Sequence, residues 1–359
     1  MALAHALGRR GLGNAWPNPA VGAVIVRDDT EGPVIVSRGW TQPGGRPHAE
    51  IGAIARAGDA ARGAVMYVTL EPCSHRGRTP PCADAILDAG LARVVSALED
   101  PNPEVAGRGH ARLRAAGVAV DIGLGAEEAR RAHAGHIRRM RDHRPHVLLK
   151  LAVSADGKVG LAGRRPAAIT GEQVRARVHL MRATNDAILI GVGTALADDP
   201  QLTCRLPGMS DRSPVRVVLD PALRLPLASA LVKSARATPL WVAAAPEASS
   251  ESAGALEGEG VDVLRVPAGA GKLDLTAVLT LLADRGITRL MVEGGPTVAA
   301  SFVAADLVDE VALFRAPKHI GADGIDALEG MPIAALMRKL KPVGSEPVGE
   351  DSVEFFERA

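Results

Sequence analysis

Short runs of β-branched and aliphatic residues alternate with helix-like stretches, and this alternation constrains the fold more than any other feature. In the first part of the chain, strands are predicted at residues 21–26, 34–36, 65–70, 93–98 and 118–122, and helices at 49–57, 83–89 and 108–116. Gly58, Gly90 and Gly117 follow the three helices and are typical stops. Helices that alternate with strands in this way predict a layered α/β domain.

The alternation restarts after a very basic stretch at residues 137–144. A helix is predicted at 127–141, and a domain boundary is predicted near Pro145, which divides the chain into 1–144 and 145–359. In the second series, strands are predicted at 146–153, 187–190, 215–219, 240–244, 289–292 and 310–314, with a helix at 172–182. The segment 246–260 is rich in Ala, Ser, Glu and Gly and is predicted to be a surface excursion.

The composition excludes several classes of function. The 359 residues carry 42 Lys and Arg against 41 Asp and Glu, a net charge of +1, so neither nucleic acid nor an anionic membrane is expected as a partner. Aromatic residues make up only 2%, too few to stack the bases of a single strand. Three cysteines do not suggest a disulfide framework. Because neither a targeting signal nor an apolar run of about 20 residues is recognised, a cytoplasmic location is expected.

One histidine and two cysteines in the first part of the chain have the chemistry of a zinc site. His48, Cys73 and Cys82 offer one imidazole and two thiolates, which leaves the fourth zinc position for a water. Zinc can lower the pKa of that water to about 7. Glu50 lies too close in sequence to His48 for both to be ligands, and is better suited to pass the water proton to a leaving amine. The pattern corresponds to the zinc deaminase signature, although eight residues rather than two separate the cysteines.

Two other interpretations of these residues stay open. They could be scattered residues without a shared site, or they could form a closed structural zinc site, for which His75 is the nearest fourth ligand. Cys204 is far away and is interpreted as an ordinary small residue. A second group of histidines lies among many arginines that would repel a cation, so a solvated helix face and linker are predicted there rather than a metal site, at His133, His136, His143 and His146.

The second part of the chain carries weaker signals. Residues 294–297 (GGPT) lie between a predicted strand and a helical stretch, where glycines let the backbone approach a phosphate and a helix N-terminus favours the anion. A simple packing turn explains this pattern equally well, and it is not the G-x-G-x-x-G fingerprint of a Rossmann site. Lys150 lies in an apolar strand, so its ammonium group must pair or reach water; the alternative is an edge position.

Taken together, the motifs resemble the bifunctional riboflavin-biosynthesis deaminase/reductase family, the RibD family. In the first part of the chain they are residues 17–22 (PNPAVG), 48–50 (HAE), 69–75 (TLEPCSH) and 100–103 (DPNP). In the second they are residues 150–157 (KLAVSADG), 196–200 (LADDP), 292–297 (VEGGPT) and 316–318 (APK). The resemblance covers nearly the whole chain, in the order that the family has.

The resemblance implies two reactions. The first is the zinc-dependent hydrolytic deamination of 2,5-diamino-6-ribosylamino-4(3H)-pyrimidinone 5′-phosphate, a phosphorylated pyrimidine. The second is the NADPH-dependent reduction of the ribose of the product to ribitol, which gives 5-amino-6-(5-phosphoribitylamino)uracil. The resemblance also implies a cytidine-deaminase-like α/β/α domain followed by a dihydrofolate-reductase-like α/β domain, and a homo-oligomer.

The same resemblance assigns residues to the two ligands. It implies substrate contacts for Asn18, Lys150, Arg182, Asp198, Leu202, Arg205 and Glu293. It implies NADPH contacts for Ala152, Ala168, Thr194, Asp198, Pro221, Gly295, Pro296, Thr297, Val298, Ala299, Ala300 and Ser301. The cationic side chains of Arg182 and Arg205 suit the phosphate of the substrate.

The chain departs from the family pattern at three of its positions. Pro166 and Ala168 stand where the family usually has a Ser and a Trp, just before residues 169–171 (ITG). A substrate hydroxyl contact and a ring that stacks on the cofactor are therefore expected to be missing. Pro221 replaces a commonly polar residue near the cofactor.

Three other functions remain as alternatives. One is a deaminase whose reductase part has degenerated, as the departures suggest. Another is a nucleic-acid or nucleoside deaminase of the same zinc superfamily, against which the near-zero net charge and the scarcity of aromatic residues argue. The last is a zinc-stabilised scaffold without catalysis, against which the presence of Glu50 argues.

Overall fold

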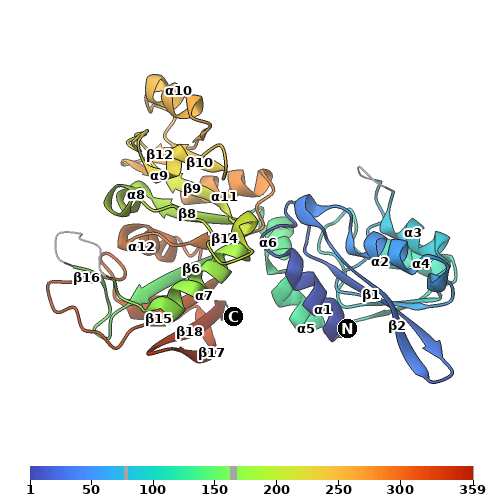
Figure 1. Ribbon diagram of the computed structural model, residues 1–359. Helices are drawn as coiled ribbons and strands as arrows, with labels where there is room; N and C mark the ends of the chain where they lie inside the picture. The colour runs from blue at the N-terminus through green and yellow to red at the C-terminus, as the bar shows by residue number, and fades with distance from the viewer. Residues whose placement is uncertain (77–79, 162–167, 359) are drawn as a thin grey trace. The chain divides into compact units, whose positions relative to one another are not determined.

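The computed structural model describes residues 1–76, 80–161 and 168–358 (Figure 1). The chain splits into two compact units, Met1–Arg144 (unit 1) and Pro145–Ala359 (unit 2). Pro166, one of the departures from the family pattern, lies outside the described residues. Within the described ranges, no helix combines the length and the apolar character that crossing a membrane requires.

Unit 1 is built on a five-stranded mixed sheet of order β2-β1-β3-β4-β5. Its strands are β1 (Gly22–Asp29), β2 (Gly32–Trp40), β3 (Val65–Val68), β4 (Arg93–Ser96) and β5 (Ala119–Ile122). β1 pairs with β2 and with β3 in antiparallel fashion, whereas β3, β4 and β5 run parallel. The five predicted strands are confirmed, and the second is longer than predicted.

Helices cover both faces of this sheet, because alternate residues of β1 point to opposite sides. Ala23 and Ile25 share a core with apolar residues of α2 (Ala49–Ala57), α3 (Cys82–Asp88) and α4 (Arg108–Ala115). Val24 points to the other face and packs against α1 (Ala2–Gly8). The sequence therefore builds three layers, and α2 and α3 lie on the same side.

The predicted helix at 127–141 is interrupted, and two of its histidines are buried. It forms α5 (Ala126–Ala132) and α6 (Ala134–Asp142), which meet at His133. Only 2% of His133 and 8% of His136 is exposed. His133 Nε2 lies 3.2 Å from Thr69 Oγ1, and His136 Nε2 lies 2.9 Å from Asp100 Oδ1. The predicted solvated face is therefore wrong for these two residues, whose buried rings each have a polar partner at Nε2. It is also wrong for His146, which is only 9% exposed, whereas His143 is exposed.

Gly39 of β2 allows α2 to approach the sheet closely. A Cβ atom at Gly39 would lie 2.1 Å from the carbonyl oxygen of Ala49 and 2.7 Å from the nitrogen of Ala53, both backbone atoms of α2. No side chain fits at that distance without displacing the helix. Since His48 and Glu50 belong to the start of α2, Gly39 helps to set their height above the sheet.

Unit 2 contains a nine-stranded sheet of order β11-β10-β9-β8-β14-β6-β15-β18-β17. Its strands are β6 (His146–Val153), β8 (Ala187–Gly191), β9 (Val215–Leu219), β10 (Leu240–Ala244), β11 (Asp262–Arg265), β14 (Arg289–Val292), β15 (Glu310–Arg315), β17 (Leu340–Val348) and β18 (Asp351–Arg358). The pairings from β11 to β15 are parallel, and those of β18 with β15 and β17 are antiparallel. Two short ladders join β7 (Lys158–Gly160) to β16 (Ile325–Asp326) and β12 (Ala268–Gly269) to β13 (Lys272–Leu273).

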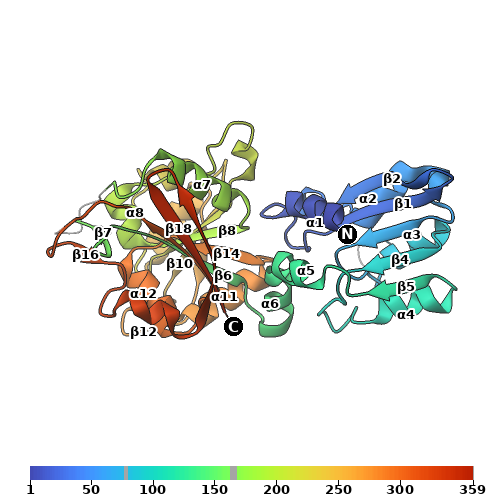
Figure 2. The same cartoon turned by 90° about the horizontal axis from the view of Figure 1, so that it is seen from below.

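Helices flank both faces of the larger sheet (Figure 2). α7 (Glu172–Ala183) lies on one side, whereas α11 (Leu275–Asp284) and α12 (Pro296–Ala304) lie on the other. α7 packs Val174, Val178 and Met181 into a core with β6, β14 and β15. The short α8 (Val192–Asp198) and α9 (Ala230–Lys233) pack against β8, β9 and β10.

The segment 246–260, predicted to be a surface excursion, is mostly exposed, but it is helical and anchored in the core. It contains α10 (Ser250–Gly258), whose Ala253 and Leu256 are buried in the core over β8–β10. The side chain of Ser249 accepts a hydrogen bond from the Ser252 N–H and caps the helix. Two buried apolar residues and a cap are enough to anchor a helix whose composition is otherwise that of a loop.

We predict opposite effects of two glycine-to-alanine substitutions in this region. Gly39→Ala should destabilise unit 1 by about 1–3 kcal/mol, because the new methyl group overlaps the backbone of α2. Gly52→Ala, within α2, should stabilise it by about 0.5–1 kcal/mol, because its nearest neighbour would be the flexible end of Arg56 at 3.8 Å and alanine favours helix. Urea unfolding of the full chain measures both changes, and equal midpoints for the two variants would contradict the close approach.

Candidate functional sites

Three zinc-type ligands from distant parts of the sequence meet in unit 1. His48 directly precedes α2, Cys73 lies in the loop after β3, and Cys82 is the first residue of α3. His48 Nδ1 lies 3.3 Å from Cys82 Sγ and 3.8 Å from Cys73 Sγ. The ligand atoms of the three residues all lie within 4.8 Å of one another.

The spacing of these atoms fits zinc. Tetrahedral coordination with usual bond lengths places a nitrogen and a sulfur ligand about 3.6 Å apart, between the two distances observed. Among the described residues, the group is formed by His48, Cys73 and Cys82, and the exposed His75 does not belong to it. A closed structural site with His75 as the fourth ligand is therefore not supported.

The pKa values of the two thiols are shifted in opposite directions. The hydrogen bond with the Cys82 side chain, followed by the interaction with His48, lowers the pKa of Cys73 to about 4. The same hydrogen bond, together with burial, raises the pKa of Cys82. Cys73 also accepts a hydrogen bond from the backbone N–H of Cys82, at 3.3 Å. One thiolate is thus already favoured by the protein itself.

Glu50 lies in the first turn of α2, beside this group, and is only 4% exposed. Burial is the largest effect on its carboxyl group and raises its pKa, although the nearby His48 opposes the shift. The carboxyl group also interacts with the Cys82 side chain. A buried acid with a raised pKa next to candidate metal ligands has the properties of a group that takes up and releases a proton during a reaction.

Asn18 is placed beside the ligand His48, on the side away from the cysteines. Its Nδ2 donates to the carbonyl oxygen of Gly45 at 2.9 Å and lies 3.4 Å from His48 Nε2. Gly45 has a φ of +83°, and a Cβ there would lie 2.6 Å from the Asn18 amide. Asn18 therefore supports the imidazole that the sequence predicted as a zinc ligand.

The loop that carries Cys73 is fastened by Glu71, which is 3% exposed. One carboxylate oxygen accepts hydrogen bonds from Gly109 N at 2.8 Å and His110 N at 3.2 Å. The other accepts from Asp100 N at 3.1 Å and Gly107 N at 3.0 Å. Four backbone donors compensate the burial of this charge. Glu71 thereby joins the ends of β3 and β4, next to the candidate metal ligands.

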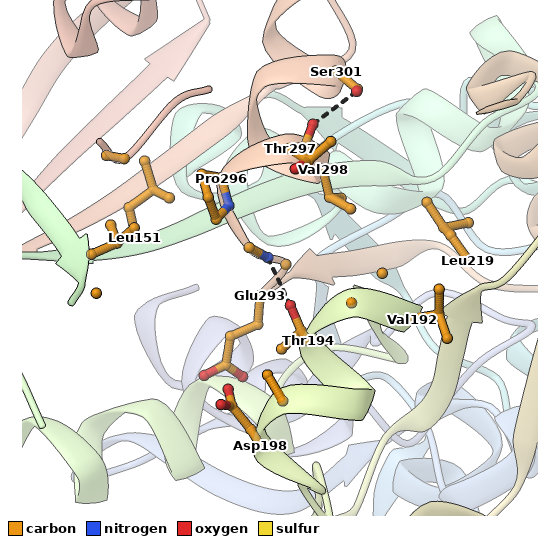
Figure 3. Close-up of a pocket in the computed structure, with 18 of the residues that line it drawn as sticks. Leu151, Val192, Thr194, Asp198, Leu219, Glu293, Pro296, Thr297, Val298 and Ser301 are labelled. Carbon is orange, nitrogen blue, oxygen red and sulfur yellow. Dashed lines mark hydrogen bonds between the residues drawn. The ribbon is translucent and has the colours of Figure 1, made fainter. Parts of the chain in front are cut away.

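Unit 2 contains a cavity of about 1080 Å³ that suits a large ligand (Figure 3). Two glycine-containing turns form much of its wall: residues 191–194, after β8, and residues 294–297, after β14. The two turns are joined by a hydrogen bond of 3.2 Å from Gly295 N to Thr194 Oγ1, drawn in Figure 3. Because β8 and β14 are neighbouring parallel strands, their turns meet at the same edge of the sheet.

A three-membered ion network lies beside this wall. Glu293 accepts a hydrogen bond from Lys150 Nζ at 3.3 Å, and its other oxygen accepts from Arg182 Nε at 3.1 Å and Nη2 at 2.9 Å. Burial would raise the pKa of Glu293, but the charges and hydrogen bonds of Lys150 and Arg182 outweigh it and hold the pKa below its usual range. Lys150 is therefore a paired interior lysine, not an edge residue, since β6 lies between β14 and β15.

Most residues predicted to bind ligands in unit 2 line the cavity. They are Lys150, Ala152, Ala168, Thr194, Asp198, Pro221, Glu293, Gly295, Pro296, Thr297, Val298 and Ser301. Figure 3 shows the carboxyl groups of Asp198 and Glu293 on the same side of the cavity. Burial raises the pKa of Asp198.

Five predicted residues are not part of the cavity lining. Arg182 is turned to Glu293, and Arg205 lies 3.4 Å from both Gln201 and Thr203. The side chain of Leu202 is in the apolar core. Ala299 and Ala300 are buried within α12.

Several residues that line the cavity were not predicted from the sequence. The turn after β8, residues 191–194 (GVGT), could have been found, because it repeats the strand–glycine–helix pattern of the turn after β14. Arg175, Arg224 and Lys272 also contribute, and no sequence signal marks them as site residues.

Both units match models of known protein families. Residues 1–98 match the cytidine and deoxycytidylate deaminase zinc-binding region, and residues 145–353 match the RibD C-terminal domain. The chain is 42% identical to the riboflavin biosynthesis protein RibD of Escherichia coli, over 98% of this chain and 96% of that protein. It is 38% identical to RibD of Aquifex aeolicus, over 100% and 97% of the two chains.

Solved structures agree with these matches. RibD of Acinetobacter baumannii is 33% identical, with a TM-score of 0.88, over 100% of this chain and 97% of that one. The diaminohydroxyphosphoribosylaminopyrimidine deaminase/5-amino-6-(5-phosphoribosylamino)uracil reductase of Thermotoga maritima is 34% identical, with a TM-score of 0.85, over the same shares. The predicted order of a cytidine-deaminase-like α/β unit and a reductase-type α/β unit is confirmed. The chain belongs to the RibD family, the bifunctional deaminase/reductases of riboflavin biosynthesis.

Proposed function

We propose that residues 1–144 form a zinc-dependent deaminase domain that acts on 2,5-diamino-6-ribosylamino-4(3H)-pyrimidinone 5′-phosphate. The observation that carries this proposal is the buried acid Glu50 beside the group of His48, Cys73 and Cys82. When bound by these three ligands, zinc lowers the pKa of a water in its open position to about 7.

In this proposal, Glu50 moves the proton. Its carboxylate takes a proton from the attacking water, and the resulting acid gives that proton to the amino group that leaves as ammonia. The burial that raises the pKa of Glu50 favours its protonated form, which is the form that gives the proton to the leaving amino group. Asn18 keeps His48 in place on the opposite side of the ring.

Glu50→Gln should retain zinc and the fold but lower the rate of ammonia release by at least about 100-fold, because an amide cannot accept the proton of the water. Zinc content and ammonia release from the diamino substrate are the measurements. Glu31→Gln, in an exposed turn, is the matched control and should keep full activity.

Reduction of separately supplied deaminated product should persist in Glu50→Gln, because this chemistry is assigned to the other unit. Near-normal ammonia release by a zinc-loaded Glu50→Gln variant would remove Glu50 from the proposed role. Loss of both activities would show instead that the substitution disturbs the whole chain.

We propose that residues 145–359 form a reductase domain that converts the ribose of the deaminated product to ribitol with NADPH. The cavity of about 1080 Å³ supports this proposal, because it has room for a dinucleotide and a second ligand. NADPH, when bound, supplies a hydride to the sugar. The turn at Gly295 and the N-terminus of α12 line the cavity and suit the pyrophosphate. The Gly295 N–H is bonded to Thr194 and Pro296 has none, so the donors that the helix start offers are the N–H groups of Thr297 and Val298.

Lys150 and Asp198 are the polar side chains that we assign to the ribose. Lys150 is held by its hydrogen bond to Glu293, and Asp198 lines the cavity from α8. Arg182 is assigned a supporting role, because its guanidinium group holds Glu293. We further propose a homo-oligomer and a cytoplasmic location, on the family resemblance and the sequence alone.

Ala168→Trp should tighten NADPH binding about two- to twelve-fold. Ala168 lines the cavity, and a ring there could stack on the cofactor, which is worth about 0.5–1.5 kcal/mol. Titration of NADPH into the full chain measures this change. Leu161→Trp is the matched control, since Leu161 is exposed outside the cavity and should leave the affinity unchanged. An unchanged or weaker affinity of Ala168→Trp would contradict the proposed place of the cofactor.

A further inference from the structure

The cavity of unit 2 extends across the ends of four neighbouring strands, β9, β8, β14 and β6. Three strand spacings correspond to about 14 Å. In Figure 3, Leu219 of β9 and Leu151 of β6 lie at opposite sides, and the contact between Thr194 and the Gly295 turn lies between them. A long ligand can therefore be laid across the strands with its middle over the glycine turns.

This arrangement orients a nicotinamide dinucleotide. The pyrophosphate is the middle of such a cofactor, and the two turns are the places where the backbone approaches most closely. Lys150 and Glu293 lie toward β6, where the proposed function places the sugar that is reduced. The nicotinamide end must then point to β6, and the adenosine end to β9.

Two cationic side chains that line the cavity, Arg224 and Lys272, follow β9 and β11, on the side of the sheet away from β6. Arg224 follows β9, and its side chain is 59% exposed. Lys272 begins β13, directly after a hairpin turn in which Ala270 and Gly271 both have positive φ. Within the described part of the chain, Arg224 has one ion-pair partner, Asp220, whose Oδ1 lies 3.7 Å from its Nε, and Lys272 forms no ion pair.

The two acidic side chains near this end, Asp220 and Asp274, each accept hydrogen bonds from backbone N–H groups. Asp220 is fully buried, and its Oδ2 accepts a hydrogen bond from Leu225 N at 2.8 Å. Asp274 caps α11, where its Oδ1 accepts from Thr276 N at 2.8 Å and from Ala277 N at 3.2 Å. Dinucleotide sites that prefer NADH place a free carboxylate against the 2′-hydroxyl of the adenosine ribose, whereas sites for NADPH place an arginine there.

We propose that Arg224 and Lys272 bind the 2′-phosphate of NADPH and thereby select it over NADH. The inference rests on the proposed reductase function and adds the basis of its cofactor preference. The buried carboxylate of Asp220 lies 3.7 Å from Nε of Arg224, and no ion pair engages the two Nη groups in the described part of the chain. Ion pairs of a guanidinium and an ammonium with one phosphate are charge-assisted and depend on salt.

The test measures the binding of NADPH and of NADH to the zinc-loaded full chain. The change in cofactor fluorescence reports the binding. The wild-type chain should bind NADPH at least about tenfold more tightly than NADH. Added salt should weaken the binding of NADPH more than the binding of NADH. Lys272→Ala and Arg224→Gln should each lower the affinity for NADPH at least about fivefold and change the affinity for NADH less than about twofold. Their combination should remove most of the preference.

Lys233→Ala is the matched control, because Lys233 is an exposed cation of α9 that does not line the cavity. It should leave both affinities unchanged. Lys272 is exposed in a hairpin, so its substitution tests the proposal even if Arg224→Gln fails to fold. A double variant that keeps the preference, or a wild type that binds both cofactors equally, would overturn the inference. Failure of the wild type to bind either cofactor would instead overturn the proposed reductase function.

Discussion

The convergence of neighbouring parallel strands is the constraint on which both candidate sites depend. Parallel strands end at the same edge of a sheet, so residues far apart in sequence meet there. In unit 1, β3 and β4 end together, and Glu71 ties the segment that follows β4 to the loop of Cys73. In unit 2, β8 and β14 end together, and Thr194 is bonded to Gly295. In unit 1, the close approach of α2 to Gly39 of β2 helps to hold the site at this edge in position.

Two buried carboxylates make the edges rigid, and they do so in different ways. Glu71 is surrounded by four backbone N–H donors, which satisfy its charge without a cation and fix the path of the chain. Glu293 is balanced by Lys150 and Arg182, so it fixes side chains instead. Removing one partner of such a buried group leaves the other uncompensated, which costs several kcal/mol as an order of magnitude. The first arrangement therefore fixes the backbone, whereas the second holds the side chain of Lys150 at the cavity.

Much of this could be predicted from the sequence, and the exceptions have physical causes. The strands were found because their apolar runs are regular, and the group of His48, Cys73 and Cys82 because its ligand types are rare together. His133 and His136 were misjudged because the arginines around them dominate the composition, although the helix turns these two rings inward. Matching a residue to a family motif also does not say where its side chain points, as Arg182, Leu202 and Arg205 show. Lys272 lies in a hairpin of two-residue strands, too short to leave a periodic signal.

The central claim is that one chain carries out two successive reactions, and its most direct test is the stoichiometry of the products. The full-length, zinc-loaded chain is supplied with the diamino ribosylaminopyrimidinone phosphate and NADPH, and ammonia and NADPH are measured in the same sample. The account predicts that, at completion, one NADPH is oxidised for each ammonia released, because the deaminated product is then reduced. Release of ammonia without oxidation of NADPH would contradict it, and would show a deaminase whose second unit no longer catalyses the reduction.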